Sequence, residues 1–173
     1  MTDVIKEGAL IPDMSLKAIV KEEIKDIKLS QLFADKSLMH PDDKKIVLFS
    51  VPGAFTPTCS AKHLPGYMTY AQAFKEKKVD QIVCLSVNDP FVMKAWCDVN
   101  KANNDIIFLA DGNATFSKAL GLTFDGGMYS LGIRGQRFAM ILNGLKVEKL
   151  FIEKPGVFDV SSAEKVLAYL SSS

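Results

Sequence analysis

The segment IVLFSVPGAFTPTC, residues 46–59, joins an apolar run to a proline-punctuated turn, and a helix-like stretch follows it. Cys59 therefore falls in the first turn of a predicted helix, where unpaired backbone N–H groups and the positive end of the helix dipole favour thiolate over thiol. Thr56 lies three residues earlier, so its hydroxyl can fold back toward the sulfur. Two plainer interpretations stay open, with Cys59 as a small buried hydrophobe and Thr56 as an N-cap of the helix.

Apolar runs and helical patterns alternate along the rest of the chain. Strands are predicted at 46–51, 81–87, 106–110, 137–142 and 146–152. Helices are predicted at 59–77, 90–101, 114–120 and 162–170. This order of elements predicts an α/β domain with a mixed central sheet. The length of 173 residues predicts a single domain over 1–173, with a surface loop at 36–45.

Several local signals refine these elements. Asn143 and Gly144 between two strands predict a β-hairpin. Gly121 predicts the end of a helix, Ser161 with Glu164 predicts a capping box, and Pro65 should kink or break the helix at 59–77. The helix at 90–101 is predicted to present one apolar face formed by Phe91, Val92, Ala95, Trp96 and Val99.

Composition excludes several classes of function. The net charge of +1, from 21 basic and 20 acidic residues, predicts no binding of nucleic acid or of an anionic membrane. No apolar run approaches a membrane span, and the first residues do not form a secretory signal. Three cysteines without a CxxC pair predict no disulfide framework. We therefore expect a cytoplasmic protein, or an organellar one if a targeting peptide has been removed.

The spacing P-x-x-x-T-x-x-C, within VPGAFTPTCSAKHLPGY at 51–67, resembles the peroxiredoxin active-site motif of the type II, peroxiredoxin-five-like subfamily. Two further segments, CLSVNDPFVMKAW (84–96) and GIRGQRFAMIL (132–142), resemble the same family in order and distance. The resemblance spans 4–170. It implies a thioredoxin-like fold and a thiol-dependent peroxidase of hydrogen peroxide and alkyl hydroperoxides.

The resemblance also assigns roles to individual residues. Cys59 would attack the peroxide as a thiolate and become a sulfenic acid, with Thr56 beside it and Pro52 shaping the pocket wall. Arg137 matches the family's catalytic arginine, and Arg134 is a weaker candidate, although either could be an ordinary surface arginine. His63 is interpreted as a structural or rim residue, with an acid–base role as the alternative.

No cofactor is implied, and no metal. With His40 and His63 as the sole histidines and no clustered ligand spacing, a zinc site is not expected.

The step that regenerates the thiol is the least determined. Cys84 is interpreted as a buried core thiol or as a resolving cysteine, and Cys97 as incidental. Mammalian type II enzymes carry a resolving cysteine near the C-terminus, and residues 98–173 contain none. An external thiol, either glutathione with glutaredoxin or thioredoxin, is therefore the expected reductant.

The resemblance further implies a homodimer formed through loops around the active site. The expected apolar contacts are Phe55, Phe91, Phe124 and Met128. Two rival functions would use the same cysteine. A thiol–disulfide oxidoreductase would normally need a CxxC pair, which is absent. A redox-sensing or chaperone-like protein would use oxidised Cys59 as a signal and would oxidise once rather than turn over.

Overall fold

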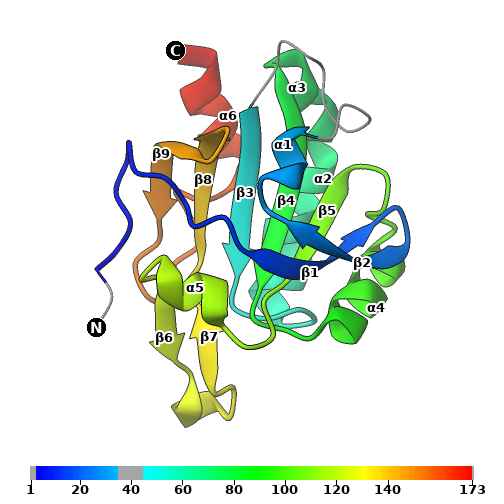
Figure 1. Ribbon diagram of the computed structural model, residues 1–173, viewed down its shortest axis with the longest axis vertical. Helices are drawn as coiled ribbons and strands as arrows, with labels where there is room; N and C mark the ends of the chain where they lie inside the picture. Colours follow the sequence, from blue (N-terminus) through cyan, green and yellow to red (C-terminus); the bar gives the residue numbers. More distant parts are fainter. Residues whose placement is uncertain (1–2, 35–44, 173) are drawn as a thin grey trace.

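The computed structural model describes residues 3–34 and 45–172 and contains a seven-stranded sheet in the order β2-β1-β5-β4-β3-β8-β9 (Figure 1). The strands are β1 (Ser15–Val20), β2 (Glu23–Lys28), β3 (Lys45–Val51), β4 (Val79–Ser86), β5 (Ile106–Ala110), β8 (Phe138–Asn143) and β9 (Lys146–Ile152). The three central strands β3, β4 and β5 are parallel, and the outer pairings are antiparallel. The predicted mixed central sheet is confirmed.

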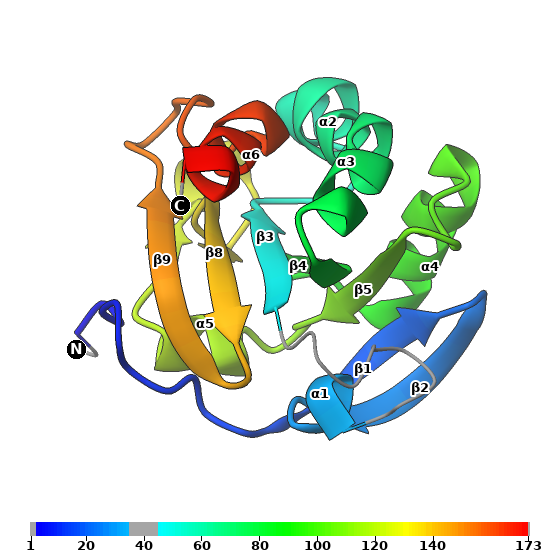
Figure 2. The same ribbon diagram turned by 90° about the horizontal axis from the view of Figure 1, so that it is seen from above.

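Helices cover both faces of this sheet (Figure 2). The helices are α1 (Gln31–Ala34), α2 (Leu64–Thr69), α3 (Ala71–Glu76), α4 (Pro90–Asn100), α5 (Thr115–Ala119) and α6 (Ala163–Ser172). Leu64, Phe74, Trp96 and Val166 from α2, α3, α4 and α6 share one buried cluster, whereas α1 and α5 contribute to a second one. Within the described residues no helix is long and apolar enough to cross a bilayer.

The central strands follow directly from their composition. β3, β4 and β5 are almost entirely buried, as expected for parallel strands with helices on both faces. The strands predicted at 106–110 and 146–152 have the observed bounds of β5 and β9, and the hairpin between β8 and β9 turns at Gly144 with φ of 61°. The predicted loop at 36–45 lies outside the described residues except for Lys45, and His40 lies there too.

The predicted apolar face of α4 is right at Val92 and Trp96, which pack in or against the core, and wrong at Phe91, Ala95 and Val99, which are exposed. Phe91 and Val99 are 76% and 70% exposed, whereas Met93, Trp96 and Cys97 are buried. Both sets repeat at helical spacing, so periodicity alone does not choose between them. The contact of α4 with β1 and β5 selects the second face.

Two further local predictions need correction. Ser162 caps α6, because its Oγ accepts a hydrogen bond from Lys165 N at 3.3 Å, whereas the Ser161 hydroxyl donates to Glu153. The helix does not end at Pro65, since the break falls at Tyr70, between α2 and α3. A π-helical segment η1 (Cys59–His63) precedes α2, so the helical register changes just before Pro65.

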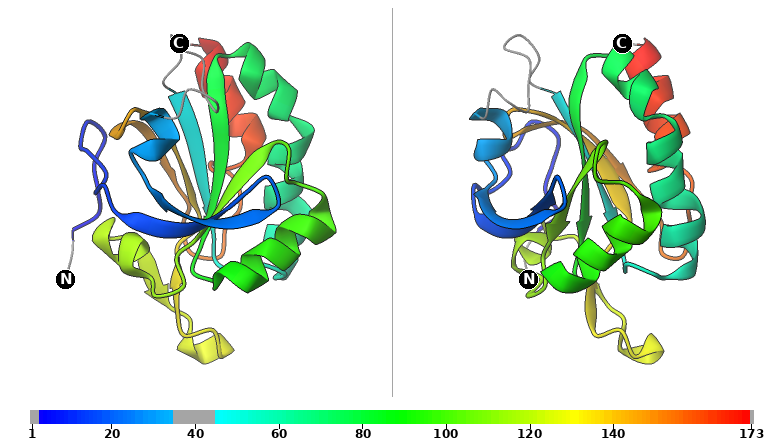
Figure 3. Two further views of the ribbon diagram at one scale, coloured as in Figure 1. Left: turned by 45° about the vertical axis from the view of Figure 1, so that its right-hand side comes forward. Right: turned by 90° about the vertical axis from the view of Figure 1, so that its right-hand side faces the viewer.

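Four strands were not predicted from the sequence. β1 and β2 form a hairpin whose turn places Lys21 and Glu22 at positive φ, without a glycine or asparagine to signal it. The strands β6 (Thr123–Asp125) and β7 (Ile133–Gly135) form a short ribbon that projects from one end of the molecule, with the 3₁₀ turn η2 (Gly127–Tyr129) between them (Figure 3).

Candidate active site

Cys59 lies where the chain leaves β3 and enters a helix, as the sequence predicted. The Ser60 N–H donates to the Thr56 carbonyl at 3.0 Å and closes the first helical turn. Cys59 opens the π-helical segment, because its carbonyl accepts from the Leu64 N–H five residues later. The side chain is fully buried beneath its neighbours, so a peroxide needs a small displacement of the covering groups to reach the sulfur.

Arg137 contacts this sulfur directly. Its Nη2 donates to Cys59 Sγ at 3.2 Å. The sheet register explains the meeting, because Ser50 near the end of β3 pairs with Phe138 at the start of antiparallel β8. Arg137, just before β8, therefore lies at the same end of the sheet as the turn that carries Cys59. A guanidinium keeps its charge at neutral pH and can stabilise a thiolate there.

His63 binds the other side of the same guanidinium. Arg137 Nη1 lies 2.8 Å from His63 Nδ1, and His63 Nε2 lies 3.1 Å from the Ser161 carbonyl oxygen. Because arginine only donates and a carbonyl only accepts, the imidazole carries its hydrogen on Nε2 and is neutral. Burial, reinforced by the Arg137 charge, lowers the pKa of His63 to about 3.

A buried carboxylate holds the segment that supports His63. Glu153 Oε2 accepts hydrogen bonds from Asp159 N at 2.6 Å, Ser161 N at 3.0 Å and Ser161 Oγ at 2.7 Å. The same segment places the Phe158 ring 5.8 Å from the Arg137 guanidinium carbon, within reach of a cation–π contact. Glu153 therefore holds the segment that carries Phe158, which contacts Arg137, and Ser161, whose carbonyl contacts His63.

The turn before Cys59 is tied together by short polar contacts. The Thr56 hydroxyl donates to the Gly53 carbonyl at 2.6 Å, and Ala54 N donates to Asn88 Oδ1 at 2.9 Å. The predicted contact from the Thr56 hydroxyl to the sulfur is thus replaced here by a bond within the turn. Pro52 is half-buried where this turn begins.

Arg134 lies beside the turn without contacting Cys59 in the described part of the chain. Its Nη1 donates to the Val87 carbonyl at 3.1 Å and its Nε donates to the Leu131 carbonyl at 2.8 Å. A Cβ at Gly53 would lie 3.3 Å from Arg134 Nη1 and 3.0 Å from Thr56 Cγ2, so the missing side chain permits this approach. Arg134 braces the surrounding loops, and Arg137 is the arginine that the fold brings to the thiol.

The comparisons with known proteins agree with this arrangement. Residues 6–167 match the Redoxin family. The chain is 53% identical over 127 residues to peroxiredoxin-2C of Oryza sativa subsp. japonica, which covers 73% of this chain and 78% of that protein. It is 38% identical over 174 residues to the chloroplastic peroxiredoxin-2E of Arabidopsis thaliana, covering 98% of this chain and 71% of that protein. A crystal structure of reduced Prx3 in complex with H₂O₂ from Vibrio vulnificus is 46% identical, with a TM-score of 0.86, and covers 96% of this chain and 99% of that one.

The chain belongs to the peroxiredoxin family. Its relatives place it among the type II, peroxiredoxin-five-like members, and the thioredoxin-like fold implied by the sequence is confirmed. The chain is accordingly a thiol-dependent peroxidase. In the described residues no group of three or more His, Cys, Asp or Glu side chains is placed to hold a metal ion.

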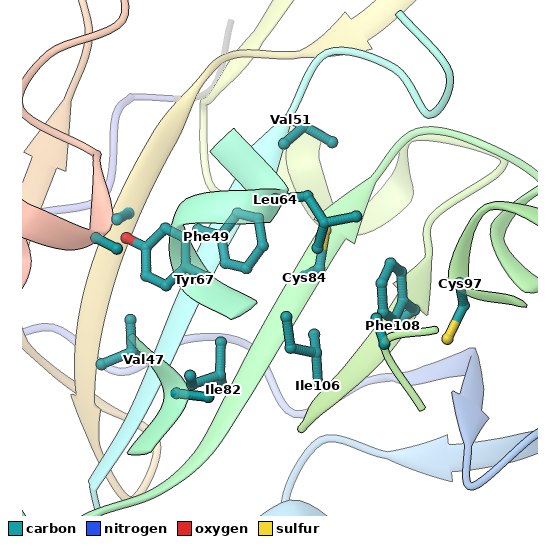
Figure 4. Close-up of a cluster of buried hydrophobic side chains, with 14 of the residues drawn as sticks. Val47, Phe49, Val51, Leu64, Tyr67, Ile82, Cys84, Cys97, Ile106 and Phe108 are labelled. Carbon is teal, nitrogen blue, oxygen red and sulfur yellow. The ribbon is translucent and has the colours of Figure 1, made fainter. Parts of the chain in front are cut away.

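The other two cysteines of this peroxiredoxin are buried on other elements of the fold. Cys84 lies on β4 in the cluster that contains Phe49 and Leu64 (Figure 4), and burial raises its pKa well above the ordinary value. Cys97 lies on α4, where its thiol donates to Asn103 Oδ1 at 3.0 Å, and burial raises its pKa to about 12. Neither thiol is a thiolate at neutral pH.

Sequence reasoning missed part of this site. His63 was interpreted as a structural or rim residue; it is fully buried, which excludes the rim, and its contact with the guanidinium was not predicted. Glu153 and Phe158 follow the last strand and match no motif, so no local signal marked them, and Ser161 was marked only as a helix cap. Asn88 stands in the quoted NDP segment, two residues before Pro90, and an asparagine in such a turn was the signal available for it.

Acid should destabilise the folded protein through His63. Between pH 6.5 and about 3 the unfolded chain binds a proton on this imidazole that the folded chain does not, so stability falls as the pH falls through that window. The loss is about 1.4 kcal/mol per pH unit, or a few kcal/mol in total. Urea unfolding at several pH values should give a shallower acid slope for His63→Asn than for wild type. Parallel slopes would contradict this placement of the neutral imidazole.

Proposed function

We propose that this peroxiredoxin reduces hydrogen peroxide and alkyl hydroperoxides through Cys59. The thiolate attacks the terminal peroxide oxygen, the O–O bond breaks, and the leaving oxygen takes a proton to become water or an alcohol. Cys59 becomes a sulfenic acid, the first product of thiol oxidation. The observation that carries the proposal is the 3.2 Å contact between Arg137 Nη2 and Cys59 Sγ.

The roles of the neighbouring groups follow from charge. Negative charge moves from the sulfur to the leaving oxygen during the reaction, and Arg137 with backbone N–H groups near Cys59 would stabilise it. Thr56 donates its single hydrogen to Gly53, so its oxygen is free to accept a hydrogen bond from an incoming peroxide. Donation to the sulfur would require Thr56 to release Gly53. Pro52 would shape the wall of the pocket.

The geometry of the thiols favours recycling by an external thiol. Cys84 is fully buried on a central strand, and a disulfide with Cys59 would require the first helical turn to unwind and the strand thiol to become accessible. We therefore propose a one-cysteine cycle in which glutathione captures the sulfenic acid. Glutaredoxin, a second glutathione or thioredoxin would then release the mixed disulfide.

Intact and peptide mass spectrometry tests this cycle. After one equivalent of peroxide with glutathione present, we expect a glutathione adduct on Cys59. A dominant Cys59–Cys84 crosslink that persists with glutathione would make the protein a two-cysteine enzyme. Turnover assays with glutathione and glutaredoxin, or with thioredoxin, identify the reductant. Oxidation of a single equivalent with every reductant would instead favour the sensor or chaperone-like alternative.

Exposed apolar side chains on the loops around the active site support a homodimer. Phe55, Phe91 and Met128 are 52%, 76% and 89% exposed, and Phe124 is half-buried on the ribbon that projects beside the Cys59 turn (Figure 3). Aromatic and methionine side chains are enriched at interface cores. We expect a dimer in sedimentation at micromolar concentration, weakened by Phe91→Asp more than by Val99→Asp on the far end of α4. Sedimentation as a monomer at all concentrations would reject the dimer.

The cellular location stays a proposal. A cytoplasmic protein fits the sequence, and the chloroplastic name of the Arabidopsis relative supports an organelle as the alternative. Localisation of the tagged full chain decides between them.

A further inference from the structure

The turn that carries Thr56 contains a strained residue. Phe55 has φ of 65°, in the left-handed region that bulky side chains rarely adopt. Its ring is 52% exposed, so packing of the ring does not hold this conformation. A strained backbone persists where surrounding contacts determine it, and such residues gather at functional sites. The contacts that hold Phe55 must therefore act on the backbone on either side of it.

Asn88 holds the backbone just before Phe55. Its Oδ1 accepts a hydrogen bond from Ala54 N at 2.9 Å, and Ala54 is buried. Because a backbone N–H can only donate, this bond also fixes which side of the Asn88 amide carries the oxygen. Without Asn88 the Ala54 donor would be buried and unpaired, and a change in the conformation of the turn would relieve that cost.

Asn88 is itself held by the regular elements around it. It lies between the end of β4 and the start of α4, where Asp89 caps the helix by accepting from Val92 N at 2.8 Å. Ser86 Oγ lies 2.5 Å from Asn88 Oδ1, and the Ser86 carbonyl accepts from Asp111 N at 2.9 Å. The amide of Asn88 therefore ties the turn to β4, to α4 and, through Ser86, to the segment after β5.

The contacts of Thr56 show what depends on this conformation. Thr56 Oγ1 donates to the Gly53 carbonyl at 2.6 Å, and Thr56 N donates to the same carbonyl at 3.3 Å. These two bonds close a turn whose middle residues are Ala54 and Phe55. A change of φ at Phe55 would separate Gly53 from Thr56 and move the Thr56 oxygen.

We propose that Asn88 is a positioning residue for the peroxidase reaction. It holds the turn in the strained conformation at Phe55, and that conformation places the Thr56 oxygen for an incoming peroxide. The inference rests on the proposed role of Thr56 and Cys59 in peroxide reduction. It assigns Asn88 no effect on the ionisation of Cys59, because Arg137 contacts the sulfur from another segment.

Removal of the acceptor tests this role. In Asn88→Ala the Ala54 amide loses its partner, and oxidation of Cys59 by hydrogen peroxide should slow about 10-fold, the factor for one buried donor left unpaired. Asn88→Asp keeps an oxygen at the same position and should recover most of that loss. Rates are compared at a pH where iodoacetamide alkylation, resolved by peptide mass spectrometry, shows Cys59 to be fully ionised.

Two substitutions at Phe55 form a matched pair. Phe55→Gly and Phe55→Ala both remove the ring, but glycine adopts positive φ freely whereas alanine does not. In the Asn88→Ala background, Phe55→Gly should therefore restore part of the lost rate and Phe55→Ala should not. An effect of the missing ring would be the same in both double variants.

The outcomes separate this inference from the proposed function. Hydrogen–deuterium exchange at the Ala54 amide should be faster in Asn88→Ala than in wild type, and this measurement needs no peroxide. An unchanged exchange rate, an unchanged oxidation rate, an equal loss in Asn88→Asp, or equal rates in the two double variants would each refute positioning by Asn88. A wild-type protein without turnover of peroxide would refute the proposed function instead.

Discussion

Replacing Cys59 with serine is expected to abolish peroxide reduction. A serine hydroxyl is not ionised at neutral pH, so the guanidinium 3.2 Å away has no anion to activate and no sulfur to oxidise. The serine is nearly the same size and can keep the buried turn intact, so the loss would be chemical. Peroxide consumption and the mass of the oxidised protein measure it directly.

The matched controls are the other two cysteines. Cys84→Ser and Cys97→Ser should retain most of the first, oxidising step, because burial raises the pKa of both thiols and keeps them protonated. Each variant places a hydroxyl in a packed site, so cooperative unfolding is checked alongside activity. Substantial peroxidase activity in Cys59→Ser, or its loss in Cys84→Ser with folding intact, would move the nucleophile away from Cys59.

The central strands and the nucleophile were predictable because their signals are local. A fully apolar run such as β5 is typical of a central strand in a sheet that helices cover on both faces. Its bounds were predicted without error. The strand–turn–helix sequence around Cys59 likewise places the sulfur without knowledge of the rest of the chain.

The missed features depend on contacts between distant segments. β2 is a charged edge strand, with Lys25, Asp26 and Lys28 exposed, and its signal is weak because an edge strand need not be apolar. Phe91 and Val99 on α4 are apolar yet exposed, so hydrophobicity alone suggested the wrong face. Phe91 belongs to the surface that we propose for a dimer, which would account for its exposure, whereas Val99 lies at the far end of α4.

The contacts around Arg137 likewise could not be predicted from local sequence patterns. The resemblance indicated Arg137, whereas its partners His63 and Phe158 are far from it in sequence and meet it only in the folded chain. Glu153 carries no motif, and its function as the anchor of Ser161 is visible only from the three hydrogen bonds that one oxygen accepts.

Replacing Arg137 with methionine is expected to slow oxidation of Cys59 by on the order of 10²–10³, the usual loss for one preorganised donor. Methionine keeps an unbranched apolar chain of similar length under Phe158 but removes the charge and both terminal hydrogen bonds. Stopped-flow fluorescence can follow the reaction through Trp96, the single tryptophan, whose Nε1 donates to Ser60 Oγ at 3.0 Å beside the nucleophile.

Graded variants show which property of Arg137 matters. Arg137→Lys keeps the charge but replaces the planar fork, whose two nitrogens bind Cys59 and His63 separately, with a single nitrogen, so its rate should fall between methionine and wild type. Thr56→Val should slow oxidation less than Arg137→Met, because the Thr56 hydroxyl already donates to Gly53 and carries no charge. Arg134→Met should act through the loops that it braces at Val87 and Leu131, with a smaller loss still. If Arg137→Met oxidises at the wild-type rate while Arg134→Met does not, the cation that activates the thiol is Arg134, and the 3.2 Å contact is not the one used in the reaction.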